Sequence, residues 1–356
     1  MNLNDLGWSN DFEQSYIERH FDGTQPARVA REEKIGYIAI GKNQVWSATL
    51  TGRLRSDAAL PIDRPAVGDW VALQPIDSAR AVIHSVLPRR SAFVRQVAGR
   101  RSDQQVVAAN IDVVFLVAGL DGDFNLRRLE RYLTLAHASG ASPVVLLNKA
   151  DLCAEIDARL REVDAIAPST PVHAVSALDG DGLQAVRAHL HAGRTAALLG
   201  SSGVGKSTLL NTLLGRVQQT TQSVRESDDR GRHTTTHREL FVLPDGGIVI
   251  DTPGMRELQL PAGSDDLSDT FADIEELAGA CRFGDCAHES EPGCAVRAAI
   301  DKGEIDARRW AGFQKLQREL HFAAIREDPA ALRERRDAWK KIHKAAKKRM
   351  KARRKW

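Results

Sequence analysis

The residues of this sequence best suited to bind phosphate form the octapeptide GSSGVGKS, residues 200–207. It follows the apolar run TAALL and precedes STLLNTLLG, so a strand should end and a helix should begin there. In that setting the glycines let the backbone wrap around phosphate oxygens, and amides at the helix N-terminus point at the anion. We expect Lys206 to reach the β- and γ-phosphates and Ser207 to ligate Mg²⁺. The candidate phosphate-binding residues are Gly200, Ser201, Ser202, Gly203, Val204, Gly205, Lys206, Ser207 and Thr208.

A second motif, NKAD at residues 148–151, ends the apolar run SPVVLLNKAD and should select the base. The Asp151 carboxylate can accept hydrogen bonds from guanine N1–H and N2–H₂, whereas adenine lacks both donors and would leave a buried acid unpaired. We expect Asn148 at the Hoogsteen edge and the Lys149 stem over the face of the base. SAL, residues 176–178, ends the next apolar run and should offer a backbone N–H to guanine O6. The candidate base-binding residues are Asn148, Lys149, Asp151, Ser176 and Ala177.

Two further segments should meet Mg²⁺ and the γ-phosphate. DTPG ends the run GGIVIDTPG, so that Asp251 would hold a Mg²⁺-bound water and the Gly254 amide would contact the γ-phosphate. The polar stretch 216–238 lies between the two phosphate-binding segments and resembles a first switch, ordered by GTP and Mg²⁺. One of its threonines should complete the Mg²⁺ shell; we favour Thr235 over Thr234 and Thr236. A plain surface loop is the alternative interpretation of this stretch.

The order of these motifs along the chain is unusual. In Ras-like proteins the phosphate loop, first switch and DxxG precede NKxD and SAx, but here NKAD and SAL come first. All five segments would be loops at one end of one sheet, so joining the usual termini and cutting elsewhere preserves the site. The sequence therefore predicts a circularly permuted G domain that binds and hydrolyses GTP.

Three of the four cysteines lie within fourteen residues, beside a histidine. Three thiolates and one imidazole would close a tetrahedral Zn²⁺ site without an open position, which is a structural arrangement. The alternative is four unrelated side chains in a small helical hairpin. Cys153 stands alone and is expected to be a small buried hydrophobe. The candidate zinc ligands are Cys281, Cys286, His288 and Cys294.

The charge of the chain is unevenly distributed. Residues 308–356 hold 18 Lys+Arg and 5 Asp+Glu, a net of +13, which leaves 50 − 18 = 32 basic and 47 − 5 = 42 acidic groups elsewhere, a net of −10. An acidic body with a basic tail favours a polyanionic partner such as RNA, although a solvated tail would have the same composition. No run of about 18 apolar residues and no secretory signal is present, so we expect a cytoplasmic protein without a membrane partner.

The elements that position these residues fall into three groups. Short β-rich runs between residues 34 and 95 (KIGYIAIG, QVWSATLTG, AVGDWVALQ, ARAVIHSVL) indicate a small barrel of the OB type, although a small β-sandwich would show similar spacing. From Ile111, solid apolar runs alternate with helical patterns such as LRRLERYLTLAHASG, which predicts an α/β domain with a parallel sheet. A helical region with the cysteine cluster follows. We expect an N-terminal extension (1–30), an OB-fold domain (31–100), a circularly permuted P-loop G domain (101–264) and an α-helical zinc-binding domain with a basic tail (265–356).

The combination resembles the bacterial ribosome small subunit-dependent GTPase family, RsgA. VGDWV, LPRRSAFVR, FNLRRLERYL, GRHTTTH and CxxxxCxHxxxxxC carry the resemblance, which covers about residues 31–300. It implies late assembly of the small ribosomal subunit, with subunit and rRNA as partners and subunit-stimulated GTP hydrolysis. It also implies that His233 positions the attacking water. Ras-like proteins place a Gln directly after DxxG, but this chain has Met255, so either His233 or the partner must supply that group.

The candidate catalytic residues are thus His233, Lys206 and Thr235. A competing hypothesis is an rRNA-binding checkpoint protein or chaperone in which GTP acts only as a release timer. A third, a zinc hydrolase acting on RNA, would require an open metal position. A monomer is the simplest expectation.

Overall fold

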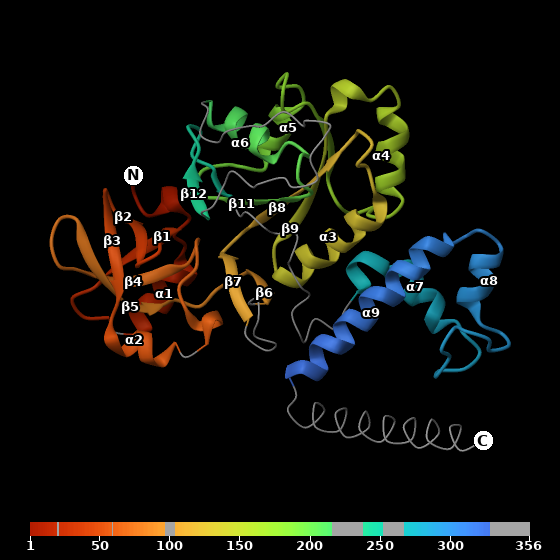
Figure 1. Ribbon diagram of the computed structural model, residues 1–356, viewed down its shortest axis with the longest axis horizontal. Helices are drawn as coiled ribbons and strands as arrows, with labels where there is room; N and C mark the ends of the chain where they lie inside the picture. The colour runs from red at the N-terminus through yellow and green to blue at the C-terminus, as the bar shows by residue number, and fades with distance from the viewer. Residues whose placement is uncertain (20, 59, 97–103, 216–237, 252–266, 328–356) are drawn as a thin grey trace, which may run out of the picture. The chain divides into compact units, whose positions relative to one another are not determined.

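The computed structural model describes residues 1–19, 21–58, 60–96, 104–215, 238–251 and 267–327 (Figure 1). The chain groups into two compact units: Met1–Gln259 with Ser268–Ala272, and Leu260–Leu267 with Asp273–Trp356. The predicted switch stretch before Arg238, the DTPG segment beyond Asp251 and the basic tail beyond Glu327 lie outside the described residues.

The first unit begins with a closed five-stranded barrel. Its strands are β1 (Gln25–Glu32), β2 (Tyr37–Gly41), β3 (Gln44–Leu50), β4 (Trp70–Pro75) and β5 (Arg80–Val86), paired in the ring β1-β2-β3-β5-β4-β1. The β3–β5 pair is parallel and the others are antiparallel, with helix α2 (Gly52–Asp57) between β3 and β4. This ring is the OB topology, so the barrel prediction is confirmed and the sandwich alternative is wrong.

The first thirty residues, which we expected to be an N-terminal extension, form a 3₁₀ turn η1 (Asn4–Leu6), helix α1 (Asn10–Glu18) and most of β1. Leu6 and Phe12 are buried against Trp70 and Leu87 of the barrel. The strand prediction began at about residue 34 and therefore missed β1. The N-terminal segment packs on the barrel because its apolar side chains recur at helical spacing beside the Trp70 ring.

The G-domain sheet has the order β10-β9-β8-β11-β13-β12. The strands are β8 (Val113–Gly119), β9 (Ser142–Asn148), β10 (Val172–Val175), β11 (Thr195–Gly200), β12 (Glu239–Val242) and β13 (Ile248–Asp251). All are parallel except β12, which runs antiparallel to β13. Every apolar run predicted to be a parallel strand is one, but β10 is only partly buried. The strand β12 was not predicted.

Helices cover both faces of this sheet (Figure 1). Leucines of α5 (Leu183–Ala188) and α6 (Lys206–Leu214) share one core cluster with side chains of β8, β9 and β11. Helix α3 (Leu126–Ser139) contacts β8 and β9 and was predicted from the pattern LRRLERYLTLAHASG. It begins at the capping side chain of Asn125 and ends at the left-handed Gly140. Helix α4 (Ile156–Asp164) follows the 3₁₀ turn η3 (Ala150–Leu152).

A buried arginine joins the barrel to the G domain. The Arg28 guanidinium donates to the carbonyl oxygens of Leu6 (2.6 Å), Gly68 (3.1 Å) and Asn110 (2.9 Å) and to Thr195 Oγ1 (2.8 Å). Burial lowers the pKa of Arg28 to about 10, so the side chain stays charged at neutral pH. Arg28 therefore ties the N-terminal segment, the barrel and two parts of the G domain to one point.

The VGDWV and LPRRSAFVR motifs form the same junction. Asp69 is fully buried and receives two hydrogen bonds of 2.8 Å from the Arg89 guanidinium. Gly68 has φ +93°, and a Cβ there would lie 2.1 Å from the Ala109 oxygen, so only glycine allows this approach. LPRRSAFVR continues into a hairpin of β6 (Ala92–Gln96) and β7 (Gln104–Ala109), with the 3₁₀ turn η2 (Pro61–Asp63) beside it. Both motifs thus have a structural role.

The second unit is helical and contains the cysteine cluster. It holds most of α7 (Ser268–Gly279, with non-helical backbone at Phe271), α8 (Ala295–Asp301) and α9 (Ala307–Glu327). On α9 the side chains of Phe313, Leu316 and Leu320 are buried, and Trp310 is half-buried. None of the described helices is both long and apolar enough to cross a bilayer.

Candidate nucleotide site and metal centre

The predicted nucleotide-binding segments follow the carboxyl ends of parallel neighbouring strands. β9 ends at Asn148, β10 at Val175, β11 at Gly200 and β13 at Asp251. Because parallel strands end at the same edge of a sheet, NKAD, SAL, the phosphate loop and the start of DTPG gather at one edge. The unusual chain order of the motifs therefore does not separate them in space.

Asn148 links three of these segments directly. Its side-chain Nδ2 donates to the Val204 carbonyl of the phosphate loop at 2.7 Å, and its Oδ1 accepts from the Ala177 amide of SAL at 2.9 Å. The side chain is 2 % exposed, so both bonds are shielded from water. Gly205 has φ +98°, and a Cβ there would lie 2.2 Å from Asn148 Nδ2. The glycine before Lys206 is thus required by the contact with Asn148.

The SAL segment is also held by helix α6. Thr212 Oγ1 donates to the Ala177 carbonyl at 2.9 Å, and Ser176 Oγ donates to Asp179 Oδ2 at 3.0 Å. Ser176 and Ala177 are buried, while Leu178 is largely exposed. These contacts fix the place of SAL relative to the helix that starts at the phosphate loop.

The phosphate loop leads from β11 into α6, which begins at Lys206. The Lys206 ammonium donates to the carbonyl oxygens of Gly200 (2.9 Å) and Ser201 (2.5 Å) and so lies over the loop. Ser207 and Thr208 form the first turn of α6 and are half-buried, whereas Ser202 and Gly203 are exposed. The amides of a helix N-terminus, with a lysine beside them, suit the binding of a phosphate chain.

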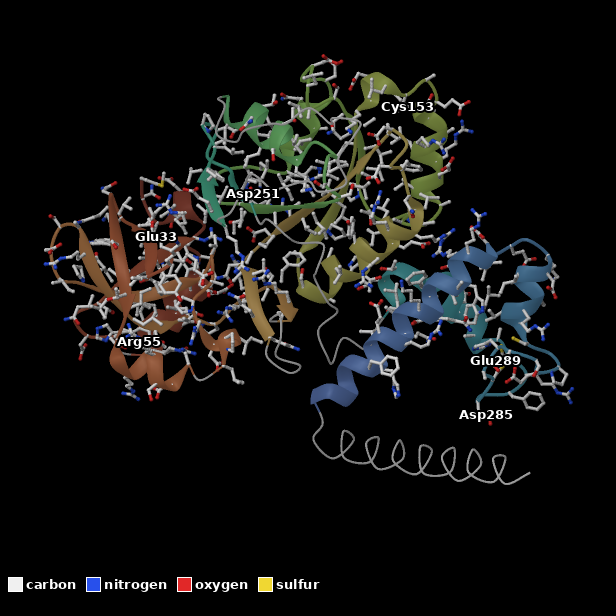
Figure 2. All side chains as sticks on the ribbon, viewed as in Figure 1. Glu33, Arg55, Cys153, Asp251, Asp285 and Glu289 are labelled. Atoms are coloured by element: carbon white, nitrogen blue, oxygen red, sulfur yellow. The ribbon has the colours of Figure 1, made fainter. Side chains whose placement is uncertain are left out.

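The remaining predicted residues are described only in part. Asp251 is 8 % exposed at the end of β13, the strand next to β11 (Figure 2). Asp151 is exposed beyond Lys149. Gly254, His233 and the threonines Thr234, Thr235 and Thr236 lie outside the described residues. Cys153, expected to be buried, is a free thiol that is only half-buried, because its neighbours in the loop before α4 are exposed.

An acidic loop at the same edge was not predicted. Residues 120–125 connect β8 to α3 and carry Asp121 and Asp123. Asp121 Oδ2 lies 2.6 Å from Lys149 Nζ, and Ser201 Oγ donates a short hydrogen bond to Asp123 Oδ2. Asp123 is also paired with Arg128 of α3 at 2.8 Å. The signal that would have found this loop is its place directly after a buried parallel strand.

The cysteine–histidine cluster has the geometry of a tetrahedral metal site. Cys281 Sγ and Cys294 Sγ each lie 3.5 Å from His288 Nδ1, and the two sulfur atoms lie 3.9 Å apart. With Cys286 included, all four ligand atoms lie within 4.8 Å of one another. With Zn–S of about 2.3 Å and Zn–N of about 2.0 Å, ligand atoms of a tetrahedral site lie about 3.5–3.8 Å apart. The cysteines are free rather than paired, so this donor set fits Zn²⁺.

The surrounding residues hold the ligands in place. The Glu291 carboxylate accepts from the amides of Ala287, Glu289 and Ser290 at 2.9–3.0 Å, which shapes the loop around His288. The Trp310 ring of α9 meets the His288 ring edge-on at 5.5 Å. Figure 2 labels Asp285 and Glu289 in the loops that carry this cluster.

A profile described as RsgA GTPase matches residues 86–261. The Small ribosomal subunit biogenesis GTPase RsgA of Opitutus terrae is 48% identical over the whole of both chains. That identity over the full length decides the family. The chain belongs to the RsgA GTPases.

Two solved structures have the same fold. YjeQ from Thermotoga maritima matches with a TM-score of 0.61 at 27% identity, over 83% of this chain and 98% of its own. YloQ, described as a circularly permuted GTPase, matches with a TM-score of 0.60 at 23% identity, over 85% of this chain and 96% of its own. The predicted permutation is therefore confirmed by the strand order and by the fold shared with these structures.

Proposed function

We propose that this RsgA GTPase binds the small ribosomal subunit and couples GTP hydrolysis to late maturation of the subunit and to its own release. The observation that carries the proposal is the double hydrogen bond of Asn148, which joins the base-selecting segments to the phosphate loop at one sheet edge. Ribosomal action is suggested by the name of the relative from Opitutus terrae, which matches over its full length.

In this proposal Asp151 selects guanine, Asn148 and Ala177 shape the base pocket, and the Lys149 stem covers the base. The phosphate-loop amides and Lys206 bind the phosphates, so that GDP and GTP both fit. Mg²⁺ would be held by Ser207, a switch threonine (Thr235 favoured) and, through water, Asp251; it supplies charge neutralisation on the phosphates. The Gly254 amide would donate a hydrogen bond to the γ-phosphate, a contact that GDP cannot make.

Water positioning is assigned to His233 or to the ribosomal partner. The residue after DTPG is Met255, which has no group able to orient water. Hydrolysis would therefore be slow in the free protein and faster on the subunit, where His233 is held near the γ-phosphate or a partner group is added.

The zinc centre would be structural, with Cys281, Cys286, His288 and Cys294 as its ligands. Four protein ligands leave no position for water or substrate, which disfavours the zinc-hydrolase hypothesis.

The domains of the protein would be an N-terminal segment (1–30), an OB domain (31–100), a GTPase domain (101–264) and a zinc-binding domain with a basic tail (265–356). We propose a cytoplasmic monomer whose tail contacts rRNA phosphates.

A GTPase assay with and without purified small subunits, at several salt concentrations, tests this function. We expect a marked stimulation that weakens as salt rises, because contacts with rRNA phosphates are screened. Lys206→Ala and Ser207→Ala should abolish turnover. An equal rate with and without subunits would refute the ribosomal part.

The alternative, an rRNA checkpoint protein in which GTP is only a release timer, makes a different prediction for binding. Its affinity for subunits would be the same with GTP, with GDP and without nucleotide. A co-sedimentation series in those three states separates the two hypotheses, since the leading proposal requires tighter binding with GTP.

A further inference from the structure

The acidic loop between β8 and α3 lies against the base-selecting motif. The Leu120 amide donates to the Asn148 carbonyl at 2.7 Å, so the loop backbone is tied to the strand end that carries NKAD. The next residue, Asp121, pairs with Lys149 at 2.6 Å. Loop and motif therefore form one local assembly.

The ion pair is ordered and partly shielded from water. The side chains of Lys149 and Asp121 are only 24% and 29% exposed. Asp121 Oδ1 accepts from the Asp123 amide at 3.0 Å while Oδ2 accepts from Lys149, so both oxygens of the carboxylate are held. Partial burial acts to raise the pKa of Asp121, but the Lys149 ammonium and the Asp123 amide outweigh it and the pKa lies below its ordinary value.

The backbone leaves room for this carboxylate. A Cβ on Gly119, the last residue of β8, would lie 2.7 Å from Asp121 Oδ1 and 3.5 Å from Val204 Cγ2 of the phosphate loop. A larger residue at position 119 would push the Asp121 carboxylate away from the position that it has here. Lys149 itself has φ +64°, a left-handed conformation that side-chain-bearing residues rarely adopt.

We propose that Asp121 is a positioning residue for the guanine base: by fixing the Lys149 ammonium, it holds the Lys149 stem where the face of the base packs. The inference rests on the proposed guanine site, in which Lys149 covers the base. An unpaired lysine side chain would lose conformational entropy when the nucleotide binds. The ion pair restricts Lys149 already in the nucleotide-free protein, so less entropy is lost on binding. Asp121 should thus affect the affinity for GDP and GTP equally and leave hydrolysis of bound GTP unchanged.

The test is a double-mutant cycle on the full-length protein with fluorescent GDP and with a non-hydrolysable GTP analogue. Asp121→Ala should raise both dissociation constants about five- to tenfold, the size expected for a partly buried charge-assisted hydrogen bond. Asp121→Asn keeps the size and one acceptor and should cost about two- to threefold. If Asp121 acts through Lys149, Lys149→Ala combined with Asp121→Ala should bind no more weakly than Lys149→Ala alone.

The matched control is Asp245→Ala. Asp245 pairs with Arg187 at 2.5 Å in the turn between β12 and β13, at the opposite edge of the same sheet. Its removal should leave both dissociation constants unchanged. Steady-state kinetics should agree with the binding data. The KM of Asp121→Ala for GTP should rise, while kcat at saturating GTP should stay at the wild-type value.

Three results would overturn the inference: wild-type affinity in a folded Asp121→Ala protein, additive losses in the cycle, or a loss confined to GTP. Thermal melting without nucleotide checks the fold, and if Asp121→Ala does not fold, the cycle is run with Asp121→Asn. Wild-type protein that binds no guanine nucleotide would instead refute the proposed function, so the two failures are distinguishable.

Discussion

Asn148 shows how one side chain can assemble a site from segments far apart in the chain. Its amide group contacts Val204 on one side and Ala177 on the other, and all three residues are buried. The sequence predicted Asn148 at the base edge; in the structure both halves of its amide bond protein atoms. Asn148 therefore contributes to the stability of the site before any nucleotide arrives.

Asn148→Ala should reduce the free energy of unfolding by about 2–4 kcal/mol, because a buried carbonyl and a buried amide each lose their partner. Urea unfolding without nucleotide measures the change. Gln44→Ala is the control, since the Gln44 amide donates to the Ser78 carbonyl at an exposed site on the barrel. Its change should stay within about 0.5 kcal/mol, and an equal loss in both variants would contradict the assigned role.

The His173–His189 pair predicts an acid-sensitive G domain. The two Nε2 atoms lie 3.0 Å apart, so one ring must be a neutral acceptor. Burial lowers the pKa of both histidines, and His173 and Arg194 lower that of His189 further. The unfolded imidazoles, with pKa near 6.5, therefore take up protons before the folded ones do, and stability falls as the pH drops through that value.

His189→Gln should reduce the slope of unfolding free energy against pH between about pH 7 and pH 5, since one titrating group is removed. Urea unfolding at a series of pH values gives the slope. The same pair of proteins at pH 8, where both rings are neutral in the folded and unfolded states, serves as the reference. An unchanged slope would show that the pair does not contribute.

At the scale of elements, Arg28 explains why β1 was not predicted from the sequence. β1 reads QPARVARE, where charged residues interrupt the apolar ones, and Arg28 lies in the interior although its type suggests the surface. The strands with uniform apolar runs were predicted, and so was helix α3 from its apolar periodicity and terminal glycine, because these signals are local. β12 has four residues, and the acidic loop has no motif, so both were found only through their neighbours in space.

Arg28→Met should destabilise the first unit by about 3 kcal/mol or more, because three carbonyl oxygens and the Thr195 hydroxyl lose a buried charged donor. Chemical denaturation followed by tryptophan fluorescence is the measurement, since Trp70 lies 5.7 Å from the guanidinium. Arg53→Met is the control: Arg53 is 92% exposed in its pair with Asp57. A similar small loss in both would contradict the junction role of Arg28.

At the scale of the whole molecule, the proposed nucleotide-binding residues belong to the first unit and the candidate zinc ligands to the second. Cys286→Ser should lower the zinc content from one ion per chain and destabilise the second unit, because a four-ligand site loses a thiolate. GDP affinity, which depends on the first unit, should stay at the wild-type value. Metal analysis measures the zinc content and GDP titration measures the affinity. The control variant Cys153→Ser should keep the zinc content of the wild-type protein. Equal zinc in both variants would refute the ligand assignment.

The pairing of β1 with β12 also limits how the molecule can be divided. Arg31 lies opposite Glu239 across this join, and ion pairs of 3.3 Å link Arg31 to Glu239 and Arg238 to Glu32. A shortened chain without its first ninety residues would lose this pairing at Glu239 and both ion pairs, which leaves more of the β12 edge open to a strand from another molecule. The GTPase part alone should therefore self-associate more readily than the whole protein, which size-exclusion chromatography of both would measure.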